Sequence, residues 1–356
     1  MKDIPYFDLF YLKLGNKCNF NCKHCSQGTV PRTDESDEIS PDVIQFLDDY
    51  VEKYKNRKKS IVRLWGGEPL LYFDFIKQLV KRYKNNFEYT FISNGSLLNE
   101  EIVEFINDND IKFVLSNDGK STKDIRGIDV LKNEKIKNLF EKIKNKSFMS
   151  VITALNPRID ETIDYFRKMN YEDIYIYFVW LVNHDGTKDQ DILSRIDFNE
   201  YKKGCEIAYD RYELHRKGQE HFPKEHNFIS SFLSRIKYPK KKMLDDKNTY
   251  IKKCSTCGYY VGDKMIEMDV HGNIYECHNG NNIIGTIKDN YSDIEEKVKK
   301  LKSQKIKDLD CRKCPIVDYC EGVCPNSTSL GSETWCNFSK ATFSAIIKKA
   351  FNIEIF

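Results

Sequence analysis

The sequence lacks the long apolar segments that would place a chain in or across a membrane. No window reaches about 18 consecutive apolar residues, the length that a spanning helix needs. The N-terminal residues 1–5 are not followed by the apolar stretch of a secretory signal. We therefore expect a cytoplasmic protein with no membrane partner.

A strong excess of one charge is also absent. Charged residues make up 31% of the 356 residues, and the formal net charge is only +3. Proteins that bind nucleic acid through its phosphates need a concentrated basic surface. The sequence therefore predicts no nucleic-acid partner, and its length allows roughly two domains with a substantial core.

Cysteine, by contrast, is abundant, with 12 residues in all. In a reducing compartment, cysteines favour metal binding or catalysis over disulfides. Cys18, Cys22 and Cys25 lie at offsets of four and three in a polar stretch. These offsets would also fit one face of a helix, but Gly15 and the nearby asparagines are poor helix formers. The pattern favours three thiolate ligands of an iron-sulfur cluster with one iron left open.

Apolar and β-branched runs alternate with helical patterns through the first half of the chain. We predict six strands, over residues 7–14, 60–65, 89–93, 112–116, 148–154 and 173–182. Helices are predicted over residues 41–54, 73–83, 99–107, 131–144 and 160–169. Such alternation implies parallel pairing through right-handed crossovers. The predicted fold class is α/β, a partial (β/α)6 barrel of the TIM type.

The least ordinary residues follow the predicted strands, at the end where such barrels carry their chemistry. The three-cysteine stretch follows the first strand. After the second, third and fourth strands come glycines and small polar or acidic groups: Gly66, Gly67, Glu68, Pro69, Ser93, Asn94, Ser116 and Asp118. Glycines allow a ligand to approach the backbone closely, and a carboxylate accepts hydrogen bonds from an ammonium group. We expect one shared site at the barrel mouth.

A second group of cysteines lies in the last third of the chain. Short spacings separate many of its members, as in Cys254-x2-Cys257 and Cys311-x2-Cys314-x5-Cys320-x3-Cys324. The eight cysteines of the array are Cys254, Cys257, Cys277, Cys311, Cys314, Cys320, Cys324 and Cys336. Pairs of the type Cys-x2-Cys are common in closed zinc sites with four cysteine ligands. Four thiolates also hold iron-sulfur clusters. Two zinc sites and two clusters therefore remain as alternatives.

The cysteine stretch and the Gly-Gly-Glu-Pro segment resemble those of the radical S-adenosylmethionine (SAM) enzymes. The C-terminal array resembles the SPASM domain of the peptide- and protein-modifying branch, with its Gly272-x4-Cys277 hairpin and its Cys-x2-Cys-x5-Cys-x3-Cys run. The resemblance implies a radical SAM barrel, a helical bridge, a SPASM domain and a terminal helix, at residues 1–190, 191–250, 251–340 and 341–356.

The resemblance also implies cofactors: S-adenosyl-L-methionine and three 4Fe-4S clusters. Cys18, Cys22 and Cys25 would hold the SAM-binding cluster, with SAM contacts from Gly66, Gly67, Glu68, Pro69, Ser93, Asn94, Ser116, Asp118 and Arg126. The first auxiliary cluster would be held by Cys254, Cys257, Cys277 and Cys324. The second would be held by Cys311, Cys314, Cys320 and Cys336. The sixth-strand aromatics, residues 177–180, are candidates for the adenine pocket or, alternatively, for the barrel core.

By resemblance, an electron from a donor such as flavodoxin or ferredoxin cleaves SAM to methionine and a 5′-deoxyadenosyl radical. This radical removes hydrogen from a peptide or protein substrate. We expect a ribosomal-peptide maturase that forms cross-links or thioethers, or that epimerises residues. Only 17 residues precede Cys18, so a leader peptide would be recognised by another region or by a separate protein.

Three other functions stay open. An anaerobic sulfatase-maturing enzyme, which forms formylglycine, has by family resemblance an Asp after the Gly-x4-Cys cysteine, where this chain has His278. A small-molecule radical SAM dehydrogenase is a second alternative. A non-catalytic iron-sulfur or zinc-binding interaction module is a third, from a different class, and iron content would distinguish it.

Overall fold

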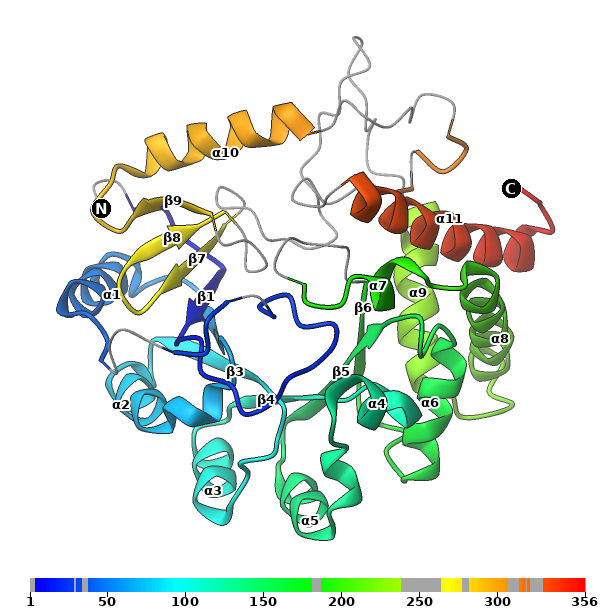
Figure 1. Cartoon of the computed structure of the whole chain (residues 1–356), viewed down its shortest axis with the longest axis horizontal. Helices are drawn as coiled ribbons and strands as arrows, with labels where there is room; N and C mark the ends of the chain where they lie inside the picture. Colours follow the sequence, from blue (N-terminus) through cyan, green and yellow to red (C-terminus); the bar gives the residue numbers. More distant parts are fainter. Residues whose placement is uncertain are drawn as a thin grey trace.

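The computed structural model describes residues 4–28, 30–33, 38–180, 187–237, 264–276, 282–305, 314–317, 319–320 and 329–355. A curved sheet runs through this part of the chain, with strand order β6-β5-β4-β3-β2-β1-β7-β8-β9 (Figure 1). The first six strands are Leu9–Lys13, Ser60–Trp65, Phe87–Ser93, Lys112–Ser116, Lys146–Ile152 and Ile176–Trp180. All neighbours among β1 to β6 pair in parallel. The predicted partial barrel is confirmed.

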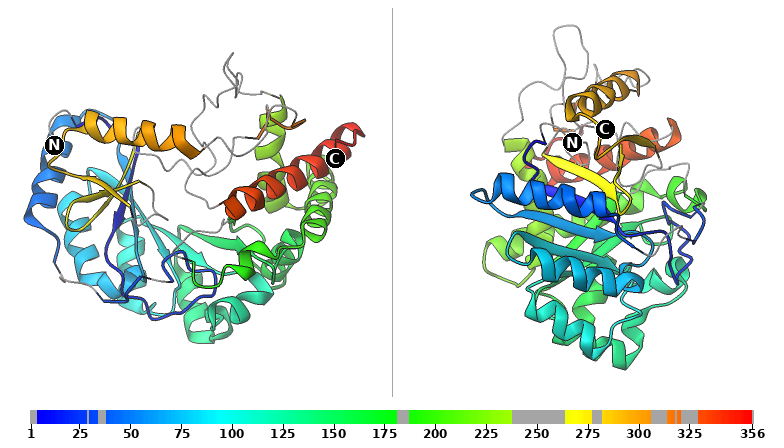
Figure 2. Two further views of the ribbon diagram at one scale, coloured as in Figure 1. Left: turned by 45° about the horizontal axis from the view of Figure 1, so that its top comes forward. Right: turned by 90° about the vertical axis from the view of Figure 1, so that its left-hand side faces the viewer.

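Helices connect the strands and cover the outside of the sheet (Figures 1 and 2). The α-helices are α1 (Pro41–Tyr54), α2 (Phe73–Tyr83), α3 (Glu100–Asp108), α4 (Thr122–Arg126), α5 (Glu134–Lys142) and α6 (Ile159–Lys168). Short 3₁₀ turns lie at η1 (Pro69–Tyr72), η2 (Gly119–Ser121) and η3 (Val130–Lys132). The helix predicted over residues 99–107 begins directly after its cap, and the one predicted over 131–144 begins later, at Glu134. Asn99 and Asn133 cap α3 and α5 with side-chain oxygens that accept backbone N–H groups.

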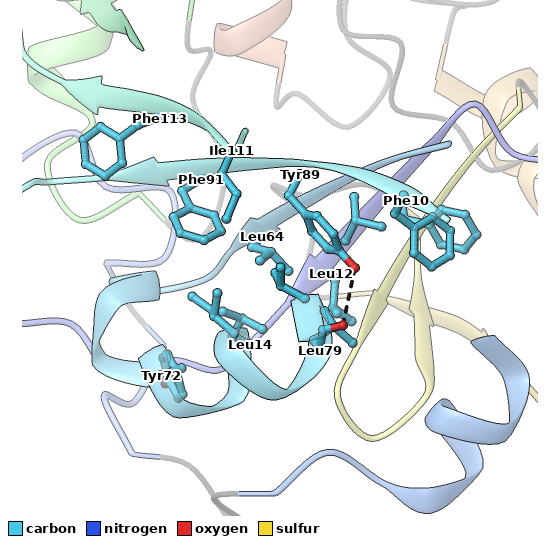
Figure 3. Close-up of a cluster of buried hydrophobic side chains, with 14 of the residues drawn as sticks. Phe10, Leu12, Leu14, Leu64, Tyr72, Leu79, Tyr89, Phe91, Ile111 and Phe113 are labelled. Carbon is cyan, nitrogen blue, oxygen red and sulfur yellow. Dashed lines mark hydrogen bonds between the residues drawn. The ribbon is translucent and has the colours of Figure 1, made fainter. Parts of the chain in front are cut away.

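The main core lies between the sheet and the outer helices. Alternate strand residues point toward the helices, among them Phe10, Leu12, Phe91 and Phe113 (Figure 3). The other residues of these strands therefore face the inside of the barrel. Apolar packing against the helices therefore fixes the outer face of the sheet. The small and polar groups at the strand ends are held in place by this packing.

The later part of the chain adds three strands to the same sheet. These are β7 (Met265–Asp269), β8 (Asn273–Tyr275) and β9 (Ile283–Thr286). The predicted hairpin is confirmed, because β7 and β8 pair antiparallel around Gly272, where φ is +87°. The sequence did not indicate that β7 pairs in parallel with β1, with Leu9 opposite Met265.

The remaining helices lie near the two ends of the sheet (Figure 1). They are α7 (Asp191–Ser194), α8 (Phe198–Arg216), α9 (Pro223–Lys237), α10 (Tyr291–Lys305) and α11 (Ser329–Phe351). A second apolar core joins α8, α9 and α11 to the end of β6 through Trp180 and Phe338, whose rings stack 5.3 Å apart. The predicted terminal helix is the later part of α11, which starts at Ser329. Among the described residues, no helix is long and apolar enough to cross a membrane.

Candidate active site

The loop after β1 carries Cys18, Cys22 and Cys25, and none of the three lies in a helix. The helical-stripe alternative for these cysteines is therefore wrong. Hydrogen bonds attach the loop to its surroundings at separate points. The Gly67 N–H donates to the Gly15 carbonyl at 3.0 Å, and the Lys23 N–H donates to the Ile125 carbonyl at 2.9 Å. The positions of the thiols are thus set by the ends of neighbouring elements.

The Gly66-Gly67 pair lies directly against this loop. Gly66 has a φ of +147°, which side chains rarely adopt. A Cβ at Gly67 would lie only 2.0 Å from the Lys17 carbonyl oxygen. The need for glycine here therefore comes from contact between two backbone segments of the chain itself.

Replacing Gly67 should displace the cysteine loop. In Gly67→Ala the new methyl group meets backbone atoms that cannot rotate away, so we expect most of the iron bound by this loop to be lost. Iron content per folded chain, with folding checked by circular dichroism, measures the effect. Gly218→Ala is the control, because a Cβ at Gly218 has open space around it, although Gly218, unlike Gly67, has a positive φ of +68° that disfavours alanine. Equal iron in both variants would contradict the expectation.

A cavity of about 470 Å³ lies at the barrel mouth and receives all three thiols. Most of the residues predicted for the site also line it: Gly66, Gly67, Glu68, Ser93, Asn94, Ser116 and Arg126. Two residues that were predicted to contact SAM do not line the cavity and lie behind its lining residues instead. Pro69 is buried at the start of η1, and Asp118 is fully buried beneath Arg126.

Glu68 joins the ends of two strands. Its Oε1 accepts hydrogen bonds from Ser93 Oγ at 2.6 Å and from the Leu70 N–H at 3.1 Å. Its Oε2 accepts from the Asn94 N–H at 2.7 Å. Burial raises the pKa of Glu68, and these three donors oppose that effect. The carboxylate thus binds the β2 and β3 ends together in addition to bordering the cavity.

Asn94 extends the same connection to the cysteine loop. Its amide nitrogen donates to Asn19 Oδ1 at 2.9 Å, between the first two cysteines. Its oxygen accepts from the backbone and the hydroxyl of Ser96 at 2.9 and 2.7 Å. The β3 end therefore positions the loop through side chains as well as through backbone contacts.

Asp118 and Arg126 form a buried ion pair at the base of the cavity. Arg126 Nε donates to Asp118 Oδ2 at 2.6 Å, and Nη2 donates to Oδ1 at 3.2 Å. Burial alone would raise the pKa of Asp118, but Arg126 and the nearby His24 hold it well below its usual range. The guanidinium also lines the cavity, so Asp118 orients the cation that faces any ligand there.

His24 sits inside the cysteine motif and is buried against this pair. Its Nε2 is 3.5 Å from Asp118 Oδ2, and neither ring nitrogen has a hydrogen-bond partner among the described residues. Burial and the adjacent Arg126 lower the pKa of His24. The imidazole therefore lies between the cysteine loop and the buried ion pair and forms part of the cavity wall.

The three thiols fit the ligand set of a cluster held by three cysteines. All three are free and half-buried, and all face the same cavity. Burial raises the pKa of Cys22 to about 11, with Arg126 opposing the shift. Arg32 Nη2 lies 3.7 Å from Cys25 Sγ, so cationic groups border the thiols on two sides. Within the described part of the chain, no three metal-binding side chains are arranged to hold a single ion.

The second cysteine array is only partly described. Cys254, Cys257, Cys277, Cys311 and Cys324 lie outside the described residues, as does His278. Cys314, Cys320 and Cys336 are half-buried, and the first two pack against the second core. The predicted auxiliary clusters therefore stay predictions.

Several cavity residues were not predicted from the sequence. Arg32 and His24 carry no spacing signal, although His24 could have been noted as the polar residue enclosed by the motif. Phe232, Arg235 and Trp335 reach the cavity from α9 and α11, and this placement depends on tertiary packing. Helical spacing on α9 would have indicated a shared face but not what it faces.

An α/β partial barrel with a three-cysteine loop at its mouth defines the structural class. Solved structures with low sequence identity share this fold. Native anSMEcpe with bound AdoMet and Cp18Cys peptide matches with a TM-score of 0.70 and 19% identity, over 97% of each chain. Streptococcus suis SuiB bound to precursor peptide SuiA matches with a TM-score of 0.57 and 16% identity, over 92% of this chain and 76% of SuiB.

Residues 12–174 match the radical SAM superfamily, so the barrel of this chain is a radical SAM domain. Radical SAM cyclopropyl synthase TigE of Paramaledivibacter caminithermalis is 23% identical over 88% of this chain. The chain spans 66% of the length of TigE and 40% of a Methanocaldococcus jannaschii protein that it also matches. The superfamily match implies SAM and one 4Fe-4S cluster as cofactors of this domain.

Proposed function

We propose that this chain is a radical SAM enzyme that acts on a peptide or protein substrate. The observation that carries the proposal is the convergence of Cys18, Cys22 and Cys25 on the cavity bordered by Gly66 and Glu68. Three thiolates leave one iron of a four-iron cluster open to a ligand. A radical SAM domain match over the same residues supports this assignment.

In this proposal the three cysteines hold the cluster, and the strand ends hold SAM. Gly66, Gly67 and Glu68 would contact the amino group, with Ser93, Asn94 and Ser116 available to hydroxyl and carboxylate groups. When bound, the two cofactors supply the one-electron cleavage of SAM that starts hydrogen abstraction.

The residues of the chain itself position and shield the reaction. Glu68 and Asn94 hold the strand ends and the cysteine loop in fixed positions relative to each other through hydrogen bonds. Asp118 holds the Arg126 guanidinium toward the cavity, where it would neutralise the SAM carboxylate. The aromatic side chains of β6 and the helices beyond it border the opposite side of the cavity and would keep water from a radical intermediate.

A peptide substrate is favoured by the relatives. SuiB is bound to a precursor peptide and anSMEcpe to a Cp18Cys peptide, and TigE is a cyclopropyl synthase. We propose cross-linking, thioether formation or epimerisation of a ribosomally made peptide, with flavodoxin or ferredoxin as electron donor and a separate leader-recognition protein. Cys314, Cys320 and Cys336, with Cys311, would hold one auxiliary cluster that carries electrons. The other four cysteines would hold a second.

The sulfatase-maturing function is a second candidate, because a cysteine-type anaerobic sulfatase-maturating enzyme of Clostridium perfringens is 26% identical over 48% of this chain. His278 in place of the expected Asp argues against it.

Anaerobic purification tests the proposal. We expect a brown protein with roughly twelve iron and twelve sulfide per chain, which forms 5′-deoxyadenosine from SAM when dithionite is added. Mass spectrometry of short peptides encoded by neighbouring reading frames, before and after reaction, would identify the product. A colourless zinc protein, or an iron protein that leaves SAM intact, would contradict it.

A further inference from the structure

The cavity has two chemically different ends. One end carries the thiols and the polar strand ends. The other carries an aromatic cluster, here called the aromatic end, made of Trp180 from β6, Phe228 and Phe232 from α9, and Trp335 from α11. Figure 1 shows α9 and α11 beside the end of β6, on the side of the barrel away from β1.

The rings of the aromatic end are closely packed. The Trp180 ring stacks on Phe338 at 5.3 Å and on Phe232 at 5.9 Å, and Trp335 meets it edge-on at 5.5 Å. The Trp180 Nε1–H donates to the Tyr201 hydroxyl at 3.1 Å, which fixes the ring further. A surface held in place before binding loses little conformational entropy when a ligand docks.

Trp335 carries a donor that the described residues leave without a partner. Its side chain is only 6% exposed and lines the cavity, and its Nε1–H has no hydrogen-bond acceptor among the described residues. Buried Trp N–H groups normally have an acceptor. A ligand carbonyl placed against the aromatic end would supply one.

The charges around the cavity disfavour a cation at this position. Arg235 lines the same end, with its guanidinium 5.0 Å from the centroid of the Phe232 ring. Glu68 is the one carboxylate among the described lining residues, and both of its oxygens accept hydrogen bonds at the opposite end. A lysine side chain would find a positive neighbour there, and no carboxylate among the described residues that line this end.

We infer that the aromatic end is a specificity subsite for a large uncharged apolar side chain of the substrate, with a main-chain carbonyl accepted by Trp335 Nε1–H. This inference rests on the proposed function, because it assigns the substrate part of the same cavity. It predicts that the peptide substrate carries an aromatic or branched aliphatic residue next to the reacting position.

Ligand-observed saturation-transfer NMR tests the subsite on the anaerobic full-length protein with its cofactors and saturating SAM. The probes are the Nα-acetyl methylamides of phenylalanine, alanine and lysine. We expect the phenylalanine probe to bind roughly tenfold more tightly than the alanine probe, and the lysine probe to give no signal. Equal binding of the three probes would overturn the inference. So would binding of the phenylalanine probe that is seen without SAM and lost at saturating SAM, which would make this end the adenine pocket.

Two variants locate the contact. Trp335→Phe keeps a ring but removes the N–H, and should weaken the phenylalanine probe about threefold to tenfold. Phe351→Ala removes an aromatic side chain that is 51% exposed and should change nothing. Unchanged binding in Trp335→Phe would overturn the inference even if the protein cleaves SAM. Absence of 5′-deoxyadenosine in samples that bind the phenylalanine probe as expected would instead contradict the proposed function alone.

Discussion

A chain in which Cys18, Cys22 and Cys25 are all replaced by Ala is expected to form no 5′-deoxyadenosine and to lose roughly four iron per chain. The reason is the shared cavity: all three thiols face it, and no other described cysteine lines it. Removing the thiolates removes every protein ligand proposed for this cluster. The effect should be complete, since in the proposed site this cluster would be the group that passes the electron to SAM.

Cys205→Ala is the matched control for this experiment. Cys205 is fully buried in α8, within the second core, away from the cavity. It should retain both iron and SAM cleavage, at a small cost in stability. Liquid chromatography of quenched reactions and iron analysis give the two readouts. Continued SAM cleavage in the triple variant would remove the basis of the proposed function.

Asp118→Asn is expected to lower the stability of the fold by about 3–5 kcal/mol, because it leaves the Arg126 guanidinium buried without its counter-ion. Asp118 is fully buried and Arg126 is only 8% exposed, so water can replace the lost carboxylate only in part, from the cavity side. Thermal unfolding followed by circular dichroism under anaerobic conditions would show a decrease of several degrees.

Two further variants make this measurement specific. Glu52→Gln breaks the exposed pair with Lys55 and should change stability by less than about 0.5 kcal/mol. The double variant Asp118→Asn with Arg126→Met removes both charges and should cost less than the sum of the single changes. An unfolding temperature for Asp118→Asn equal to that of the unchanged protein would show that the pair does not hold the base of the cavity.

The strands and helices of the barrel followed from local patterns. Alternation of residues along β2 and the helical spacing of α1 and α2 are properties of short segments, and their predicted bounds agree with the structure. The caps at Asn99 and Asn133 shifted other bounds by a few residues. Capping residues are visible in a sequence, but which of several asparagines caps a helix depends on the path of the chain.

The grouping of the site residues could also be predicted, because parallel strand ends meet at one edge of a barrel. The hydrogen-bond and ion-pair partners of these residues could not be predicted. Nothing in the sequence pairs Asp118 with Arg126 or joins Glu68 to Ser93, since each contact depends on side-chain direction in the folded chain. The aromatic end was harder still, because it assembles from β6, α9 and α11, which are far apart in sequence.

The pairing of β7 with β1 has a consequence for how the chain folds. Strand β1 lies between β2 and β7, and its second neighbour is roughly 250 residues later in the chain. During synthesis one edge of β1 stays unpaired until β7 leaves the ribosome. Until then, the N–H and C=O groups of this edge can pair with other chains. A fragment that ends at residue 237 would keep that edge permanently open, and we expect it to aggregate under conditions in which the longer chain does not.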